Sequence, residues 1–178
     1  MRTIVPVLET VVETPSTVTV RFDYPAAAAP GQFVMVWLPG DDELPMSLSY
    51  AEGALKGVTI KAMGASTRTV LGIVPGARIG VRGPYGNRFD LSPRRILVVG
   101  GGSGTAVLAP AAEGAARRGA TVVAALGATR ADELLFRDRL RGAGCGWRWR
   151  RTTARKASTA SSPRSSGRAS PPSRSTPS

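Results

Sequence analysis

The residues with the clearest chemical potential form a glycine cluster that follows a short apolar run. The run covers 96–99, and glycines stand at positions 100, 101, 102 and 104. An apolar run without alternation is typical of a parallel strand that is covered on both faces. Glycines let the backbone turn tightly and approach a ligand, and a helix expected at 104–118 would point its free N–H groups at that turn. This combination suits the binding of a phosphate.

The spacing of the cluster also fits a plain tight turn, because G-G-G-x-G differs from the usual dinucleotide pattern G-x-G-x-x-G. A second glycine-rich segment, Gly83-Pro84-Tyr85-Gly86 followed by Phe89, stands just upstream. It lies where a first domain would end and a second would begin. The two segments together favour a ligand-binding interpretation over a simple turn.

The composition excludes several kinds of site. The 178 residues include no histidine and one cysteine, Cys145, which excludes a histidine base, a zinc site and a disulfide framework within this chain. No run approaches the ~20 apolar residues of a membrane span, and the start does not resemble a signal peptide. We therefore expect a soluble, cytoplasmic protein. The net charge is +12, but every acidic residue precedes Cys145, so most of the excess lies in the last part of the chain.

The pattern of elements changes near residue 93. Before it, short strands are expected at 4–13, 16–24, 32–38, 57–63 and 77–82, with one small helix at 67–73, which is typical of an antiparallel β-barrel. After it, strands at 96–99 and 121–127 alternate with helices at 104–118 and 131–141, which indicates the start of a parallel α/β sheet. The expected organisation is a barrel at 1–92, an incomplete nucleotide-binding α/β domain at 93–144 and a disordered tail at 145–178.

Five motifs in order give the chain a family resemblance. They are Pro30-Gly31-Gln32-Phe33-Val34, Pro45-Met46-Ser47-Leu48-Ser49, Gly64-Ala65-Ser66-Thr67, Gly83-Pro84-Tyr85-Gly86 and Gly100-Gly101-Gly102-Ser103-Gly104. With them the chain resembles the ferredoxin-reductase type of flavoprotein. Within that superfamily it is most similar to the electron-transfer subunits of dihydroorotate dehydrogenase B of the archaeal type, over residues 1 to about 144. The resemblance implies an FAD-binding barrel followed by an NAD-binding domain.

The resemblance implies a first flavin segment at 44–49. Its cofactor-binding residues would be Pro45, Met46, Ser47, Leu48 and Ser49. Ser47 is the leading polar contact to the flavin and Ser49 the next, while the alternative is that both are simply polar residues of an exposed turn. Leu44 stands where many relatives carry an arginine that pairs with the FAD pyrophosphate. Lys61 or Arg68 could supply that charge instead.

A second flavin segment and a nucleotide loop follow from the same resemblance. The flavin segment comprises Thr59, Ile60, Lys61, Gly64, Ser66 and Thr67. Ser66 and Thr67 could cap a helix that holds an anion, or form a capping turn without a ligand. Tyr85 and Phe89 fit barrel-closing aromatics better than flavin-stacking ones. The nicotinamide-nucleotide loop comprises Gly100, Gly101, Gly102, Gly104 and Thr105, with Val107 in place of the usual proline. Arg130 could contact the adenosine ribose or phosphate, or be solvated.

The resemblance also implies a reaction and partners. NADH would pass a hydride to FAD, and single electrons would leave through a [2Fe–2S] cluster toward the FMN of a dihydroorotate-oxidising catalytic subunit in a hetero-oligomer. Such a cluster needs about four cysteine thiolates, so this chain cannot hold it alone. A reductase subunit for another partner, such as a sulfide dehydrogenase or a hydrogenase, fits the same residues. A nucleic-acid-binding protein that uses the basic tail is a third interpretation.

The tail from Cys145 is rich in Arg, Ser and Pro, which is typical of disorder. A reading frame shifted by one base permits Val-Ala-Val-Ala-Thr-Asp-Asp-Gly over residues 146–154, the motif that the resembled family has after its third strand. We therefore expect a frameshifted and truncated C-terminal part. In that case the third strand is absent, the partial domain packs loosely, and NADH binding is weak or missing.

Overall fold

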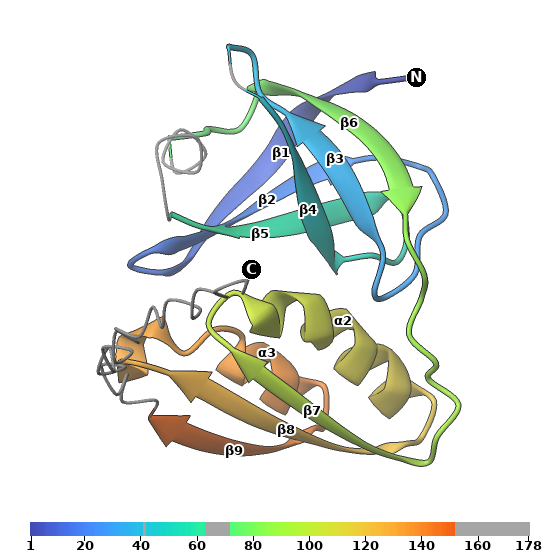
Figure 1. Ribbon diagram of the computed structural model, residues 1–178, viewed down its shortest axis with the longest axis vertical. Helices are drawn as coiled ribbons and strands as arrows, with labels where there is room; N and C mark the ends of the chain where they lie inside the picture. Colours follow the sequence, from blue (N-terminus) through green and yellow to red (C-terminus); the bar gives the residue numbers. More distant parts are fainter. Residues whose placement is uncertain (41, 63–71, 152–178) are drawn as a thin grey trace, which may run out of the picture.

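The computed structural model describes residues 1–40, 42–62 and 72–151. Two units lie one above the other, a β-barrel and a smaller α/β unit (Figure 1). Helix α2 of the smaller unit lies between its own sheet and the barrel, where it packs on β4. The predicted fold class, an antiparallel barrel followed by an α/β unit, is confirmed. No helix among the described residues has the length and apolar character needed to cross a membrane.

Six antiparallel strands close the barrel in the order β1-β2-β5-β4-β3-β6. The strands are β1 (Thr3–Thr14), β2 (Thr17–Asp23), β3 (Phe33–Trp37), β4 (Glu43–Tyr50), β5 (Leu55–Lys61) and β6 (Arg78–Tyr85). Val18, Val20 and Phe22 alternate along β2 and all three point into the barrel core. The five predicted strands are present with small shifts at their ends, and the segment at 44–49 forms a sixth. Most of the helix predicted at 67–73 lies outside the described residues.

The α/β unit has three parallel strands in the order β7-β8-β9. Its elements are β7 (Arg95–Gly101), α2 (Gly104–Arg117), β8 (Thr121–Ala128), the 3-10 helix η1 (Ala131–Glu133), α3 (Arg137–Gly142) and β9 (Gly146–Arg151). The alanines of α2 pack against β7 and β8 in a second core, separate from that of the barrel. Small side chains allow this close approach of helix and sheet.

The single helix predicted at 131–141 is wrong, because the chain forms two short pieces there. Leu135 and Phe136 lie between η1 and α3, and both are buried in the second core. Phe136 adopts a left-handed conformation with φ of 58°. A continuous helix would place these adjacent side chains in directions 100° apart, so burial of both overrides the helical pattern.

The prediction of a disordered tail that starts at Cys145, with the third strand absent, is also wrong. Cys145 is buried in the second core, and β9 pairs in parallel with β8 through Ala124↔Trp147 and Ala125↔Arg148. The physical reason is the alternation of tryptophan and arginine in Gly146–Arg151, since tryptophan favours strands and the alternation matches their period of two. The disorder predicted for 152–178 lies outside the described residues.

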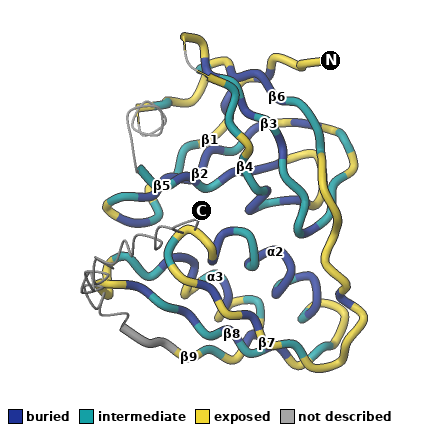
Figure 2. Tube along the Cα trace, viewed as in Figure 1, coloured by how far each residue is buried: buried dark blue, intermediate teal, exposed yellow. Residues whose placement is uncertain are grey.

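The expectation that β7 is covered on both faces is wrong as well. Leu97 and Val99 are 66% and 69% exposed, whereas Val98 between them is buried. Figure 2 shows buried and exposed residues alternating along β7. In the described part of the chain, helices cover only one face of the sheet.

Candidate functional site

The flavin segment predicted at 44–49 lies on β4, and its two serines differ in accessibility. Ser49 is 0% exposed, and its Oγ donates to the carbonyl oxygen of Gly57 at 3.2 Å. Ser47 is half-buried and lies opposite Phe33 in the β3–β4 register. Ser47 therefore has the accessible hydroxyl of the segment. The alternative of an exposed turn fails for Ser49, which belongs to a strand and is buried.

A row of three hydroxyl groups crosses β4, β5 and β2 and ends at the carboxylate of Glu13 on β1. Thr59 Oγ1 donates to Ser49 Oγ at 2.7 Å and lies 2.8 Å from Thr19 Oγ1. Thr19 Oγ1 also donates to Glu13 Oε1 at 2.6 Å. Because each hydroxyl has a partner within the row, these groups satisfy each other on the face of β2 and β5 that points away from the barrel core. Thr59, predicted for the second flavin segment, is thus engaged within the protein.

Lys61, also predicted for that segment, joins the barrel to the α/β unit. Its Nζ lies 3.4 Å from Glu133 Oε2, and the same oxygen accepts a 2.6 Å hydrogen bond from Ser16 Oγ. The Ser16 hydroxyl, followed by Lys61, lowers the pKa of Glu133. The lysine charge is therefore balanced by a carboxylate and is less available for a pyrophosphate. Ile60 is buried in the barrel core, and Gly64, Ser66, Thr67 and Arg68 lie outside the described residues.

The glycine loop lies at the carboxyl end of β7 and is packed at one end and open at the other. A Cβ at Gly100 would lie 3.0 Å from the Cα of the buried Thr105. Gly102 has φ of +52°, and its N–H donates to the carbonyl oxygen of Gly127 at 3.1 Å. A Cβ at Gly102 or Gly104 would meet nothing within 4 Å. The loop thus presents open backbone at the carboxyl ends of β7 and β8, which is where α/β sheets bind ligands.

The start of α2 is suited to an anion. Ser103 at its N-cap makes no side-chain cap hydrogen bond, and no acidic residue stands in the first turn. The positive end of the helix dipole is therefore not compensated by these local groups. Among the predicted residues, the fold brings Gly100–Gly104 and Thr105 together at this end of the sheet. Lys61 is linked to the same end through Glu133, which follows β8.

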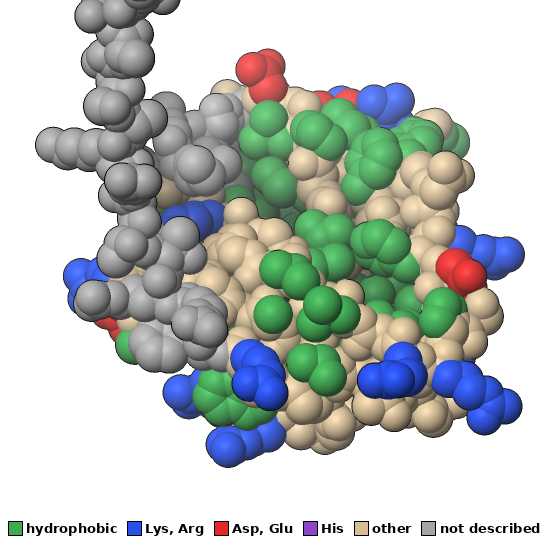
Figure 3. All heavy atoms as spheres, turned by 60° about the horizontal axis from the view of Figure 1, so that its bottom comes forward, with side chains coloured by type: hydrophobic (Ala, Val, Ile, Leu, Met, Phe, Trp, Pro, Cys, Tyr) green, Lys and Arg blue, Asp and Glu red, His purple; other side chains and the backbone are tan. Residues whose placement is uncertain are grey.

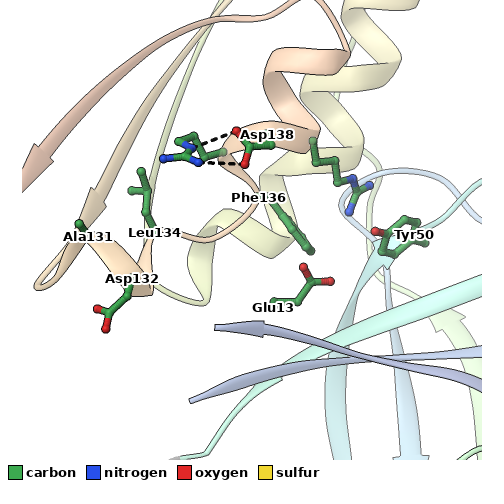
Figure 4. A pocket seen from close by; sticks show the side chains of 9 residues that line it. Glu13, Tyr50, Ala131, Asp132, Leu134, Phe136 and Asp138 are labelled. Carbon is green, nitrogen blue, oxygen red and sulfur yellow. Dashed lines mark hydrogen bonds and ion pairs between the residues drawn. The ribbon is translucent and has the colours of Figure 1, made fainter. Parts of the chain in front are cut away.

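A cavity of about 610 Å³ lies between the barrel and α3 (Figure 4). The carboxylate of Glu13 points toward it, between Phe136 and Tyr50. The guanidinium carbon of Arg139 lies 3.8 Å from the centre of the Tyr50 ring, and that of Arg21 lies 4.7 Å from it. Burial raises the pKa of Tyr50.

Arg139 is the central cation beside this cavity. It binds both carboxylate oxygens of Glu113, at 2.5 and 2.7 Å, and donates to the Ser49 carbonyl oxygen at 2.9 Å. The cluster escaped the sequence interpretation, because its members come from α2, α3 and β4 and share no local pattern.

Curated relatives were found for most of the chain, whereas no protein-family model matches it. The chain is 45% identical over 121 residues to a probable dihydroorotate dehydrogenase B (NAD(+)) electron transfer subunit of Thermoplasma acidophilum, covering 68% of this chain and 46% of that protein. It is 46% identical over 134 residues to the protein of the same name in Methanothermobacter thermautotrophicus, covering 74% of this chain and 50% of that protein. The chain thus spans about half the length of the curated relatives it matches.

Solved structures give the same fold at lower sequence identity. The ferredoxin reductase in carbazole 1,9a-dioxygenase matches with a TM-score of 0.78 and 19% identity, over 88% of this chain and 52% of that one. The NADH-dependent reduced ferredoxin-NADP oxidoreductase matches with a TM-score of 0.74 and 24% identity, over 83% of this chain and 56% of that one. The predicted resemblance is confirmed: over the aligned residues the chain is homologous to the electron-transfer subunits of dihydroorotate dehydrogenase B, and its fold is that of the ferredoxin-reductase-type flavoproteins.

Proposed function

We propose that the chain carries the FAD-binding barrel of an electron-transfer subunit, which accepts electrons from NADH and passes them toward a dihydroorotate-oxidising catalytic subunit. The observation that carries the proposal is the 45–46% identity to curated electron-transfer subunits of that enzyme. The barrel followed by a glycine loop and an uncapped helix supports it independently. The substrate, the partner and the activity of the whole relatives are part of the proposal, because the chain spans about half of their length.

The residues present fit FAD and a nicotinamide nucleotide. Ser47 offers a hydroxyl from β4 that is not enclosed in the barrel, and Pro45 beside it is exposed. Gly102 and Gly104 leave room for close approach of a phosphate to the backbone at the start of α2. FAD supplies the chemistry, because it accepts a hydride and releases single electrons.

The chain's own residues position the cofactors and take no proton-transfer role in this proposal. Ser47 orients the flavin by a hydrogen bond, while Gly102 and Gly104 bind a phosphate of the nucleotide through the backbone. The Lys61–Glu133 pair fixes the barrel against the loop that follows β8, so that both cofactor sites keep their relative position. This division of labour is usual where a cofactor performs the reaction.

The residues do not fit a [2Fe–2S] cluster. Cys145 is the single cysteine of the chain, and it is buried with its Sγ near the Ala112 carbonyl oxygen. Burial raises the pKa of its thiol, which disfavours the thiolate that an iron ligand needs. No step of the proposed function is routed through such a cluster in this chain.

The test is FAD binding by the 178-residue chain, followed by flavin absorbance and fluorescence quenching. We expect Ser47→Ala to weaken FAD binding by about tenfold, the loss of one hydrogen bond to the cofactor. Ser49→Ala is the matched control, because Ser49 is buried and bound to Gly57; it should lower stability and leave FAD affinity nearly unchanged. No FAD uptake by the folded wild-type chain, or a larger affinity loss in Ser49→Ala, would refute the assignment.

A further inference from the structure

Strand β4 passes from the barrel core to the α/β unit at a bulge that lies just beyond Ser47. Leu48 and Tyr50 pair with adjacent residues of β5, so Ser49 between them is an extra residue. Leu48 belongs to the barrel core, whereas Tyr50 packs against the core of the α/β unit. A bulge redirects the side chains of its strand, and bulges are common next to active sites. The geometry of this bulge therefore bears on the proposed flavin contact.

The backbone of the bulge is bound by an arginine of the α/β unit. Arg139 on α3 donates to the Ser49 carbonyl oxygen at 2.9 Å, and the same guanidinium binds both carboxylate oxygens of Glu113 on α2. Many arginine and lysine side chains project from the surface, as Figure 3 shows in blue for one face of the molecule, whereas the Arg139 side chain is only 17% exposed. Because its partners lie on α2 and on β4, this guanidinium holds the bulge against the two helices.

Ser47 lies where two ladders of strand pairs meet. The described pairs of β4 with β3 end at Ser47. Among the described residues, β4 pairs with β5 only at Leu48 and Tyr50, on either side of the bulge. The Ser49 hydroxyl fixes the bulge from the barrel side, and Arg139 fixes its carbonyl group from the α/β side. Since few strand pairs hold β4 at this point, the position of the Ser47 hydroxyl depends on the position of the bulge.

We propose that Arg139 is a positioning residue for the flavin, because its hold on the Ser49 carbonyl oxygen keeps the Ser47 hydroxyl in place for a hydrogen bond to FAD. The inference rests on the flavin contact proposed above for Ser47, and Arg139 itself does not touch the cofactor. A hydrogen bond weakens steeply with distance and angle, so a small displacement of Ser47 reduces its strength. Through Glu113 the same contact reaches α2, which starts at the glycine loop, so one ion pair connects the two proposed cofactor sites.

The first measurement needs no cofactor. Hydrogen–deuterium exchange of the ligand-free, full-length chain compares wild type with Arg139→Met/Glu113→Leu, a double variant in which no buried charge loses its partner. We expect peptides that cover 43–50 to exchange about fivefold faster in the double variant, the equivalent of one lost hydrogen bond, and peptides of β2 to stay unchanged. Arg139→Lys can pair with Glu113 but lacks the planar fork that also reaches Ser49, so it should change the exchange in the same direction.

The second measurement is a double-mutant cycle on FAD affinity, followed by flavin fluorescence. The Arg139→Met/Glu113→Leu change should weaken FAD binding by about fivefold in the otherwise wild-type chain. In a Ser47→Ala background the same change should have almost no effect, because the hydrogen bond that it displaces is already absent. A merely structural role of Arg139 would give the same fold-loss in both backgrounds.

Arg117→Met is the matched control. Arg117 also joins α2 to the barrel, through an ion pair of 2.6 Å with Glu52, but both side chains are more than half exposed and Glu52 follows the end of β4. This variant should leave the exchange of 43–50 and the FAD affinity near wild type. Equal effects of Arg117→Met and of the double variant would overturn the proposal, because general docking of the two units would then control the segment.

The outcomes separate this inference from the proposed function. Unchanged exchange of 43–50 in the double variant overturns the positioning role, whatever the FAD affinity. An equal loss of FAD affinity with and without Ser47 overturns it as well. No FAD uptake by the folded wild type would refute the proposed function and with it the flavin role of Arg139, while faster exchange would still show its hold on β4.

Discussion

Removal of the Arg139 side chain should destabilise the protein more than removal of any other arginine of α3. Its guanidinium links three elements, because it lies on α3, binds Glu113 of α2 and donates to the Ser49 carbonyl oxygen of β4. The Arg139 and Glu113 side chains are only 17% and 15% exposed. Arg139→Ala would leave the Glu113 carboxylate and the Ser49 carbonyl without this partner.

The expected loss follows from these contacts. Breaking a buried ion pair by removing one partner costs about 3–5 kcal/mol, and the residual exposure of this pair places it at the low end of that range. The lost hydrogen bond and the lost stacking on Tyr50 contribute about 0.5–1.5 kcal/mol each, partly within the same total. We expect Arg139→Ala to lower the free energy of unfolding by about 3 kcal/mol.

Urea unfolding followed by far-ultraviolet circular dichroism measures this loss. Arg137→Ala is the matched control, because Arg137 stands on the same helix and pairs with the exposed Asp138; its unfolding midpoint should stay near wild type. Replacing both members of the buried pair, Arg139→Met with Glu113→Leu, should recover most of the loss, since no charge is then left unpaired. Equal midpoints for Arg139→Ala and Arg137→Ala would refute the role of Arg139 as the link between the two units.

Two further predictions concern the same contact region. Ser16 and Lys61 lower the pKa of Glu133 from 4.5, so the stabilising contribution of its carboxylate is present above pH 4.5 and is lost as pH falls through the lower folded pKa. Urea titrations from pH 7 to pH 3 should show a smaller acid-induced loss of unfolding free energy in Glu133→Gln than in wild type. Parallel pH curves for the two proteins would contradict this. Gly57→Ala would place a Cβ 2.8 Å from Cδ2 of Tyr50, so the ring must move. We expect the free energy of unfolding, measured by heat or urea, to fall by about 1–2 kcal/mol. Gly53→Ala is the control for backbone strain alone, because its Cβ would meet no atom within 4 Å but its φ is +70°.

The barrel strands were predictable because their signal is local. The alternation of Val18, Val20 and Phe22 appears in the sequence, and all three side chains lie in the barrel core. The turn from β7 into α2 was predictable for the same reason, since clustered glycines after an apolar run have few structural solutions. Both signals lie within about ten residues, the range over which backbone geometry determines the pattern.

The parts that sequence reasoning missed depend on distant contacts. The composition of Gly146–Arg151 is typical of a basic tail, but this alternating segment pairs as β9 with the edge of β8. Phe136 takes a left-handed conformation because it must reach a core built from other elements. The exposure of one face of β7 was also not predictable, because an apolar run has the same sequence pattern whether one face of the strand or both are covered.

The two serines of β4 show why a motif locates a site only to within a strand. Simple alternation would place Ser47 and Ser49 on the same side, and the resemblance assigned flavin contacts to both. The register of β4 against β5 shifts between Leu48 and Tyr50, and both Leu48 and Ser49 are buried there.

Ser49 and Thr59 are hydrogen-bonded within the hydroxyl row, and Lys61 pairs with the carboxylate of Glu133. Lys61, through its side chain, and Ser49, through its carbonyl oxygen, therefore link the two units, whereas Thr59 is bonded within the barrel. Ser47 and the open glycines of the loop remain available to a ligand, so affinity for FAD should depend on β4 and on the loop more than on the charge of Lys61. In the proposed site, strand β4 would supply the contact with the cofactor through Ser47, and at the bulge it supplies the anchor for Arg139 through the Ser49 carbonyl oxygen.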